Sequence, residues 1–266
     1  MSFKKKEWSL FLDRKPMSGS WNMAVDEYLF NQTAGSSRTF LRFYTWKKPT
    51  ASLGYSQRFD RVVDEKYCRD NGIDIVRRMT GGKLVLHHKE VTYSLASSDI
   101  TIFTSRLLDS YKKISMGLML GLEKMGVHPY LADSPPESYV RGSLPCFSYP
   151  ARNEVEVDGL KVVGSAQKRV GERFVQHGSI PLEEEHDLLK NVSLLKNGED
   201  IRMISLSRIL GKPVGFDEVV KHFCEGLAEF FGVDLVPSVF SKKEKAEVAL
   251  IRKGKYGTAD WTRYRK

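Results

Sequence analysis

The spacing of apolar residues changes several times along this chain of 266 residues, and each change marks a predicted element. Alternating apolar and polar residues predict strands at residues 8–12 and 39–45. A third, shorter strand is predicted between Pro49 and Gly54. The first half of the chain therefore contributes several short strands to a sheet.

Residues 73–96 carry the pattern strand, glycine turn, strand, loop, strand. The first apolar run stops at Arg77 and Arg78, and Gly81 and Gly82 then break the backbone before the next run. These polar side chains follow a rigid strand at a turn, which is where binding and catalytic groups are often found. We therefore expect a functional site around this stretch.

Apolar residues at three- and four-residue spacing predict the helices. The predicted helices cover residues 21–30, 61–71, 107–125 and 216–231, with shorter ones at 183–189 and within 200–211. Residues 18–20 should cap the first helix, and Thr104 or Ser105 the third. Asp26 and Glu27 lie opposite the apolar face of the first helix, so we expect them to be solvated.

The second half of the chain predicts two hairpins and one long irregular segment. The hairpins turn at Asp158-Gly159, a strong turn pair, and at Gly171-Glu172. The segment 132–152 precedes them, contains several prolines and has no regular period. A loop of this length is either functional or disordered.

Meandering strands with helices between them favour the α+β class, with mixed, largely antiparallel sheets flanked by helices. We expect one domain over residues 1–266, with a basic tail segment at 235–266. The contents of apolar residues (41%) and charged residues (28%) are those of an ordinary globular protein. No apolar run reaches the roughly 18 residues of a membrane span, and the N-terminus does not resemble a secretory signal. We therefore expect a cytoplasmic protein without a membrane partner.

The formal net charge of +9 favours an acidic partner. The basic residues are dispersed, and no zinc finger or RNA-binding aromatic motif is present, so we expect no nucleic-acid partner. An acidic protein or an acyl carrier accounts for the charge.

The three cysteines are odd in number and widely spaced, which argues against a disulfide framework or a zinc site. Cys146 lies in the irregular segment, where a thiolate would be accessible, and Lys161 in the following hairpin could favour that thiolate. The alternative is that Cys146 is a small buried apolar residue. Cys68 and Cys224 fit that second description because both fall within predicted helices.

The double arginine beside Gly81 and Gly82 could hold a carboxylate or phosphate, since guanidinium groups bind oxyanions and glycine exposes backbone N–H groups. No nucleotide-binding glycine motif is present. His87, His88 and His177 match no familiar metal-ligand spacing, so we expect no metal site. We expect these histidines to hydrogen-bond neighbouring groups or to line a pocket.

Five segments, in this order, resemble the lipoate and octanoate transferases and ligases related to biotin ligase. They are NMAVDE (22–27), PTASLG (49–54), RRMTGGKLVLHHKEVTYS (77–94), DGLKVVGSAQKR (158–169) and QHGSIPL (176–182). The resemblance implies a biotin/lipoate-ligase-like catalytic domain. Three subfamilies share this fold: ATP-dependent lipoate–protein ligases, octanoyltransferases that use acyl carrier protein, and enzymes that move the acyl group between lipoyl-domain proteins.

Three features favour a cysteine-dependent octanoyl-acyl carrier protein:protein octanoyltransferase. Cys146 stands at the position that resembles the nucleophile of the thioester-forming enzymes. The chain ends near residue 266, whereas many similar ligases carry a further C-terminal domain. Lys83 replaces the third glycine that usually follows the double-arginine motif in the ligases. The ligase and the transferase between lipoyl-domain proteins remain alternatives.

The resemblance also implies a mechanism and a set of site residues. Cys146 would take the octanoyl group from acyl carrier protein and pass it to a lysine of a lipoyl-domain protein, such as the glycine-cleavage H protein, with Lys161 assisting. The enzyme would be a monomer and need no cofactor; ATP and Mg²⁺ would be required only by a ligase. The implied substrate-binding residues are Arg77, Arg78, Thr80, Gly81, Gly82, His87, Gly164, Ser165, His177 and Gly178.

Overall fold

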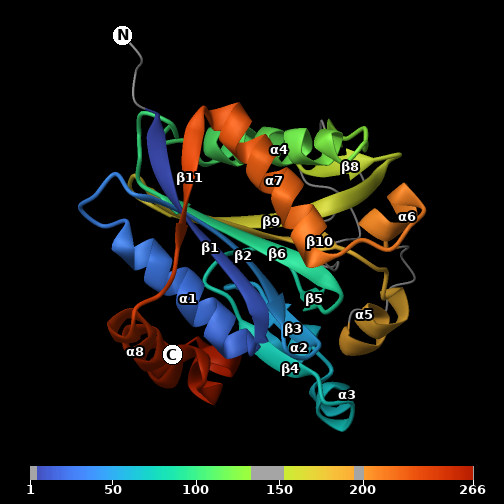
Figure 1. Ribbon diagram of the computed structural model, residues 1–266. Helices are drawn as coiled ribbons and strands as arrows, with labels where there is room; N and C mark the ends of the chain where they lie inside the picture. The colour runs from blue at the N-terminus through green and yellow to red at the C-terminus, as the bar shows by residue number, and fades with distance from the viewer. Residues whose placement is uncertain (1–4, 133–152, 195–200, 266) are drawn as a thin grey trace.

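The computed structural model describes residues 5–132, 153–194 and 201–265 (Figure 1). Cys146 and almost all of the irregular segment predicted at 132–152 lie outside the described residues. The predicted α+β class is confirmed, with one large mixed sheet, a small second sheet and helices on both faces.

The large sheet has the strand order β11-β1-β2-β6-β10-β9-β8-β7. Its strands, in chain order, are β1 (Lys6–Met17), β2 (Thr39–Trp46), β6 (Glu90–Ser97), β7 (Tyr130–Leu131), β8 (Val155–Val157), β9 (Leu160–Val170), β10 (Arg173–Pro181) and β11 (Val233–Ser238). Strand β1 is parallel to β2 and β11, and the other neighbours in this sheet are antiparallel. Both predicted hairpins are present, and Asp158 and Gly159 have the positive φ values (51° and 75°) that such a tight turn requires.

The small sheet is the stretch that the sequence marks for a site. Strand β3 (Thr50–Leu53) lies between β4 (Asp74–Arg77), to which it is parallel, and β5 (Val85–His87), to which it is antiparallel. The pattern strand, glycine turn, strand, loop, strand predicted for residues 73–96 is therefore confirmed by β4, β5 and β6.

The long helices form a layer on each face of the large sheet (Figure 1). Helices α4 (Leu107–Lys124) and α7 (Phe216–Phe231) pack together on one face, and α1 (Gly19–Gln32) and α8 (Lys242–Ile251) on the other. The short helices are α2 (Phe59–Val62), α3 (Glu65–Asp70), α5 (His186–Val192) and α6 (Leu206–Leu210), followed at the C-terminus by the π-helical turns η1 (Arg252–Tyr256) and η2 (Asp260–Tyr264). The segment 235–266, which the sequence marks as a basic tail, thus contributes part of a strand and three helical elements. Among the described helices, none is long and apolar enough to cross a membrane.

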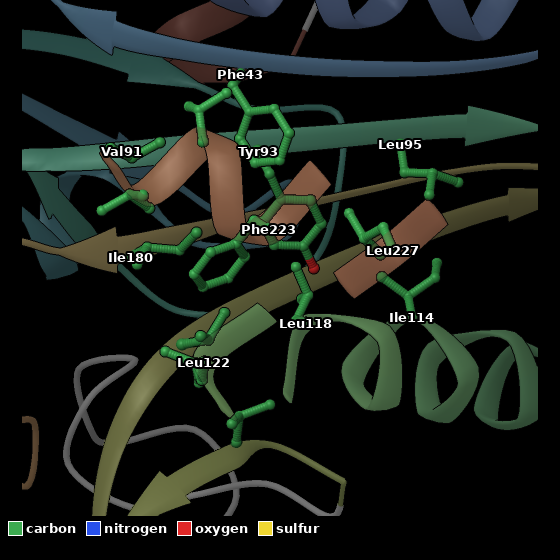
Figure 2. Close-up of a cluster of buried hydrophobic side chains, with 14 of the residues drawn as sticks. Phe43, Val91, Tyr93, Leu95, Ile114, Leu118, Leu122, Ile180, Phe223 and Leu227 are labelled. Atoms are coloured by element: carbon green, nitrogen blue, oxygen red, sulfur yellow. The ribbon is translucent and has the colours of Figure 1, made fainter. Parts of the chain in front are cut away.

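The alternating strands bury apolar side chains on both faces of the large sheet. On β6, Val91, Tyr93 and Leu95 face α4 and α7 and join their side chains in one cluster (Figure 2). On β2, Phe40 and Tyr44 belong to the opposite cluster, which also contains side chains of α1 and α8. A sheet covered on both sides holds its strands in one register, because a slip by one residue would exchange the two faces.

Three local predictions were wrong. The helix predicted at 61–71 is divided between α2 and α3. Helix α4 is preceded by Arg106, which makes no side-chain capping bond, so neither Thr104 nor Ser105 is the cap. Asp26 is buried rather than solvated, because strand β2 presents charged and polar partners to that side of α1.

The core predicts that substitutions at two nearby positions of α4 change the free energy of unfolding by different amounts. Leu118 is fully buried in the cluster of Figure 2, whereas Met116 is 40% exposed. We expect Leu118→Ala to lower the free energy of unfolding by about 2–5 kcal/mol, since a cavity remains. Met116→Ala should change it by less than about 0.5 kcal/mol. Urea denaturation of both variants measures this, and equal losses would contradict the assignment of α4 to the core.

Candidate functional site

A partly open cavity lies where side chains from both sheets and from α1 meet, and the empty space in it, including the part open to solvent, is about 370 Å³. Its walls come from β2, β3, β5, β6, β9, β10 and α1, together with the residue that follows β4. The lining residues are Met23, Tyr44, Ser52, Arg78, Val85, His87, Thr92, Gly164, Ser165, Ala166, His177, Gly178 and Ser179.

Six of the predicted site residues line this cavity, although they are far apart in the sequence. They are Arg78, His87, Gly164, Ser165, His177 and Gly178. Arg77, Thr80, Gly81, Gly82 and Lys161 do not line it. Cys146 lies outside the described residues, so its distance from the cavity stays a prediction.

Arg77 is buried, and its hydrogen bonds join three segments of the chain. Its guanidinium donates to backbone carbonyls at 2.7–3.2 Å, those of Gly54, Tyr55, Gln57, Trp261 and Thr262. The Trp261 indole in turn donates to the carbonyl of Arg77 at 2.8 Å. Arg77 therefore has a structural role, and its predicted contact with substrate stays a prediction.

Arg78 hydrogen-bonds to backbone carbonyl groups of the glycine turn. It donates to the carbonyls of Gly81 and Lys83 at 2.9 and 2.6 Å, and to both the carbonyl and the hydroxyl of Ser52 at 2.8 and 3.0 Å. A guanidinium has five N–H donors in a fixed plane, so these contacts engage most of its capacity. Arg78 thus binds carbonyl groups of the turn, and Arg77 those of two other segments; a bound anion would have to compete with these carbonyls.

Glycine is required where the segment PTASLG passes the turn. A Cβ on Gly54 would lie 1.9 Å from the carbonyl oxygen of Gly82. At the cavity, a Cβ on Gly178 would lie 2.6 Å from the ring of Tyr93 and 2.7 Å from the Ser165 hydroxyl. Any side chain at these two positions would therefore displace backbone or wall atoms.

His177 connects the first helix with the glycine turn. Its Nδ1 lies 2.9 Å from the Asp26 carboxylate, and its Nε2 lies 2.7 Å from the Thr80 hydroxyl. Burial lowers the pKa of His177 below its ordinary value and outweighs the opposing effect of Asp26. Burial alone would raise the pKa of Asp26, but the hydrogen bond from His177 and the charge of Arg42 lower it. The pair is therefore a neutral imidazole beside a carboxylate.

His87 is held in a similar way on the opposite sheet. Its Nδ1 lies 2.8 Å from the Glu90 carboxylate and its Nε2 2.7 Å from the Ser52 hydroxyl, while Trp46 stacks on the ring at 4.1 Å. Both imidazoles at the cavity thus have partners at both nitrogens, as expected of histidines that line a pocket. Among the described residues, no group of three or more His, Cys, Asp or Glu side chains is arranged to hold a metal ion.

Lys161 is 1% exposed, and its Nζ lies 2.6 Å from the carboxylate of Glu154, which is itself buried. The thiols of Cys68 and Cys224 have pKa values raised to about 11 and about 12, chiefly by burial. These two thiols are therefore almost entirely protonated at neutral pH and make poor nucleophiles.

Sequence reasoning missed the other half of the cavity wall. The missed residues are Met23, Tyr44, Ser52, Val85, Thr92, Ala166 and Ser179. One signal was available: Arg42 interrupts an otherwise apolar strand, and Tyr44, two residues later, must share its face. A charged residue at such a position requires a buried partner, which turned out to be Asp26.

The family described as "Lipoyl protein ligase A/B catalytic domain" matches residues 18–228 of this chain. Octanoyltransferase LipM of Carboxydothermus hydrogenoformans is 37% identical over 262 residues, covering 94% of this chain and 97% of that protein. Octanoyltransferase LipM of Kyrpidia tusciae is 36% identical over 264 residues, covering 94% and 96%. The family resemblance inferred from the five motifs is confirmed.

Two solved structures show the same fold. Lipoate-protein ligase A bound with ATP superimposes with a TM-score of 0.82 at 20% identity, covering 96% of this chain and 98% of that one. A bi-partite lipoate protein ligase of Thermoplasma acidophilum gives 0.80 at 20% identity, covering 97% and 96%. At such identity the likeness supports the architecture alone.

The neutral, buried His177 predicts an acid-sensitive stability. Below its ordinary pKa of 6.5, His177 binds a proton in the unfolded chain but stays neutral in the folded chain until a lower pH. The contribution of His177 is therefore complete above that pH and is lost as the pH falls toward the lower value of the folded state. We expect His177→Gln to flatten the dependence of the unfolding free energy on pH below the ordinary pKa of 6.5. His128→Asn, at an exposed position, is the control; equal slopes in all three proteins would contradict the prediction.

Proposed function

The chain belongs to the lipoyl protein ligase A/B catalytic domain family and is an octanoyltransferase, and we propose that it moves the octanoyl group through a thioester on Cys146. Acyl carrier protein is the proposed donor. A lysine of a lipoyl-domain protein, such as the glycine-cleavage H protein, is the proposed acceptor in lipoate biosynthesis. The enzyme would act as a monomer in the cytoplasm.

The observation that supports this proposal best is the cavity on which the motifs converge. It is lined by Met23, Val85, Tyr44, His87 and His177, among others, and both ring nitrogens of each histidine are hydrogen-bonded to neighbouring side chains. The eight-carbon chain of an octanoyl group suits such a wall, because it offers only apolar surface to be buried.

The proposed chemistry has two steps. The Cys146 thiolate attacks the carbonyl carbon of the octanoyl thioester, a new carbon–sulfur bond forms, and the carrier's phosphopantetheine leaves as a thiol after protonation. The lysine amine of the acceptor then attacks the octanoyl-Cys146 thioester, giving an amide, and the Cys146 thiol is released. Covalent catalysis of this kind replaces one difficult transfer by two easier ones. Lys161 would favour the thiolate and stabilise the developing oxyanion by its charge.

We also propose that the reaction requires neither ATP nor Mg²⁺. Both arginines of the RRMTGG segment direct their donors to backbone carbonyls, which leaves them poorly disposed to bind the phosphate of an acyl-adenylate. An ATP-dependent lipoate ligase would instead release AMP in the presence of free lipoate. Transfer between two lipoyl-domain proteins would proceed without acyl carrier protein. Assays with each donor separate the three reactions.

Cys146 should carry the acyl group. Incubation with octanoyl-acyl carrier protein is expected to add the mass of one octanoyl group to the protein, and peptide mapping should place it on Cys146. Cys146→Ala should abolish both the adduct and the transfer. Cys224→Ala is the matched control and should keep both, because burial raises the pKa of that thiol to about 12. A Cys146→Ala protein with full activity would contradict the proposal.

Lys161→Gln should slow the transfer by about 10²-fold or more, the effect of losing one stabilising donor in a buried site. Lys168→Gln, on the same strand, is the control and should retain most of the activity. The measurement is the single-turnover rate of acyl-enzyme formation. Equal rates for the two variants would assign Lys161 to the fold through Glu154 rather than to the chemistry.

A further inference from the structure

The segment NMAVDE has a role in the site that its sequence does not reveal. We propose that Asp26 is a positioning residue of the acyl pocket, which acts through His177 and thereby decides which acyl chains fit. This inference rests on the proposed function, because it takes the cavity to be the acyl-binding pocket. Asp26 itself does not line the cavity, so its effect must pass through a neighbour.

The Asp26 carboxylate is 1% exposed and accepts three hydrogen bonds. The donors are His177 Nδ1 at 2.9 Å, Arg42 Nη1 at 3.0 Å and the Tyr44 hydroxyl at 3.0 Å. An ionised carboxylate can only accept, so the proton between Asp26 and His177 lies on Nδ1. Asp26 thereby selects one of the two neutral tautomers of His177.

The selected tautomer decides what the other edge of the ring can do. With the proton on Nδ1, Nε2 is an acceptor, so the Thr80 hydroxyl donates to it at 2.7 Å. The imidazole is therefore fixed at both edges, between helix α1 and the turn that follows β4. His177 forms part of the cavity wall, so the orientation of its side chain affects the shape of that wall.

Helix α1 is also held against β2 by hydrogen bonds to Arg42. Asn22 lies one turn before Asp26, and its side-chain oxygen accepts from Arg42 Nη2 at 2.9 Å. Arg42 is fully buried on β2, and its bonds to Asn22 and Asp26 hold the helix against that strand. Met23, which follows Asn22, lines the cavity. Asn22 keeps its own hydrogen bond to Arg42 when Asp26 is lost, so we expect the loss to change the wall at the His177 ring rather than at Met23.

A purely structural role for Asp26 predicts a different result. If Asp26 only neutralises Arg42, its loss should cost the same whether or not His177 is present. If it acts through His177, its loss should cost little once the imidazole is gone. A double-mutant cycle distinguishes the two because it measures the interaction between the residues.

The cycle uses Asp26→Asn, His177→Phe and the double variant, with the dissociation constant of octanamide as the readout. Octanamide needs neither Cys146 nor an acceptor, so the test is independent of the thioester chemistry. We expect Asp26→Asn to weaken binding about tenfold, as for a lost buried hydrogen bond, and less than about twofold in the His177→Phe protein. It should also reduce the preference for octanamide over hexanamide and decanamide, because the wall is less rigid.

Two further measurements exclude a general effect on folding. The ¹⁵N chemical shifts of His177 should show the Nδ1–H tautomer in the wild type and a mixture of tautomers in Asp26→Asn. Glu27→Gln is the matched control: the neighbouring carboxylate of Glu27 binds Lys255 at 2.6 Å, away from the cavity, and octanamide binding should be unchanged. If Asp26→Asn does not fold, Thr80→Val replaces it in the same cycle and tests the other edge of the imidazole.

Equal costs of Asp26→Asn with and without His177, or an unchanged tautomer, would overturn the inference and leave the proposed function intact. Failure of the wild type to bind octanamide would overturn the pocket assignment and this inference together. Acylation of Cys146 is measured separately by mass, so a failure of the thioester proposal is recognised independently.

Discussion

The fully buried guanidinium of Arg42 is the interaction on which the site depends. It donates to Asp26, to Asp13 and to Asn22, and it lies 3.8 Å from the centre of the Tyr44 ring. A buried charge is tolerated only when it is paired and hydrogen-bonded, and removing one partner from such a pair typically costs about 3–5 kcal/mol. Arg42 therefore holds β1, β2 and α1 in one arrangement, and that arrangement places Met23 and Tyr44 at the cavity.

Two further buried arginines, Arg77 and Arg78, hydrogen-bond to backbone carbonyl groups around the turn that follows β4. This segment is not part of a regular ladder, so its carbonyl groups need partners other than strands. Arg78 supplies partners for the carbonyls of Gly81 and Lys83 in this turn, and Arg77 does the same for the carbonyls of Gly54 and Gln57 after β3. Arg77 also binds carbonyls of η2, while Trp261 donates back to Arg77. The C-terminal segment is thereby joined to the end of β4, next to Arg78, which lines the cavity.

These networks explain how a pocket built largely from polar residue types can suit an acyl chain. Histidines, serines and an arginine line the cavity, yet their hydrogen-bonding atoms have partners among the surrounding protein groups. Such a wall costs little to desolvate when an apolar group enters, because no polar atom loses water that it cannot replace. The transfer chemistry would then belong to the proposed catalytic residues, Cys146 and Lys161.

The sequence alone determined most of the elements and the family. Periodicity is a local property, so strands β2 and β6, helices α4 and α7 and the Asp158-Gly159 hairpin could be predicted from neighbouring residues. Tertiary structure decided which partners the polar residues bind. The sequence placed Asp26 on a solvated face, because the helical period shows which residues share a face but not what packs against it. Nor could local periodicity show that Arg77 and Arg78 would donate to backbone carbonyls. Asp26 meets Arg42 and His177, and the arginines meet carbonyls, only after distant strands pair in register; those contacts, absent from any local pattern, form the site.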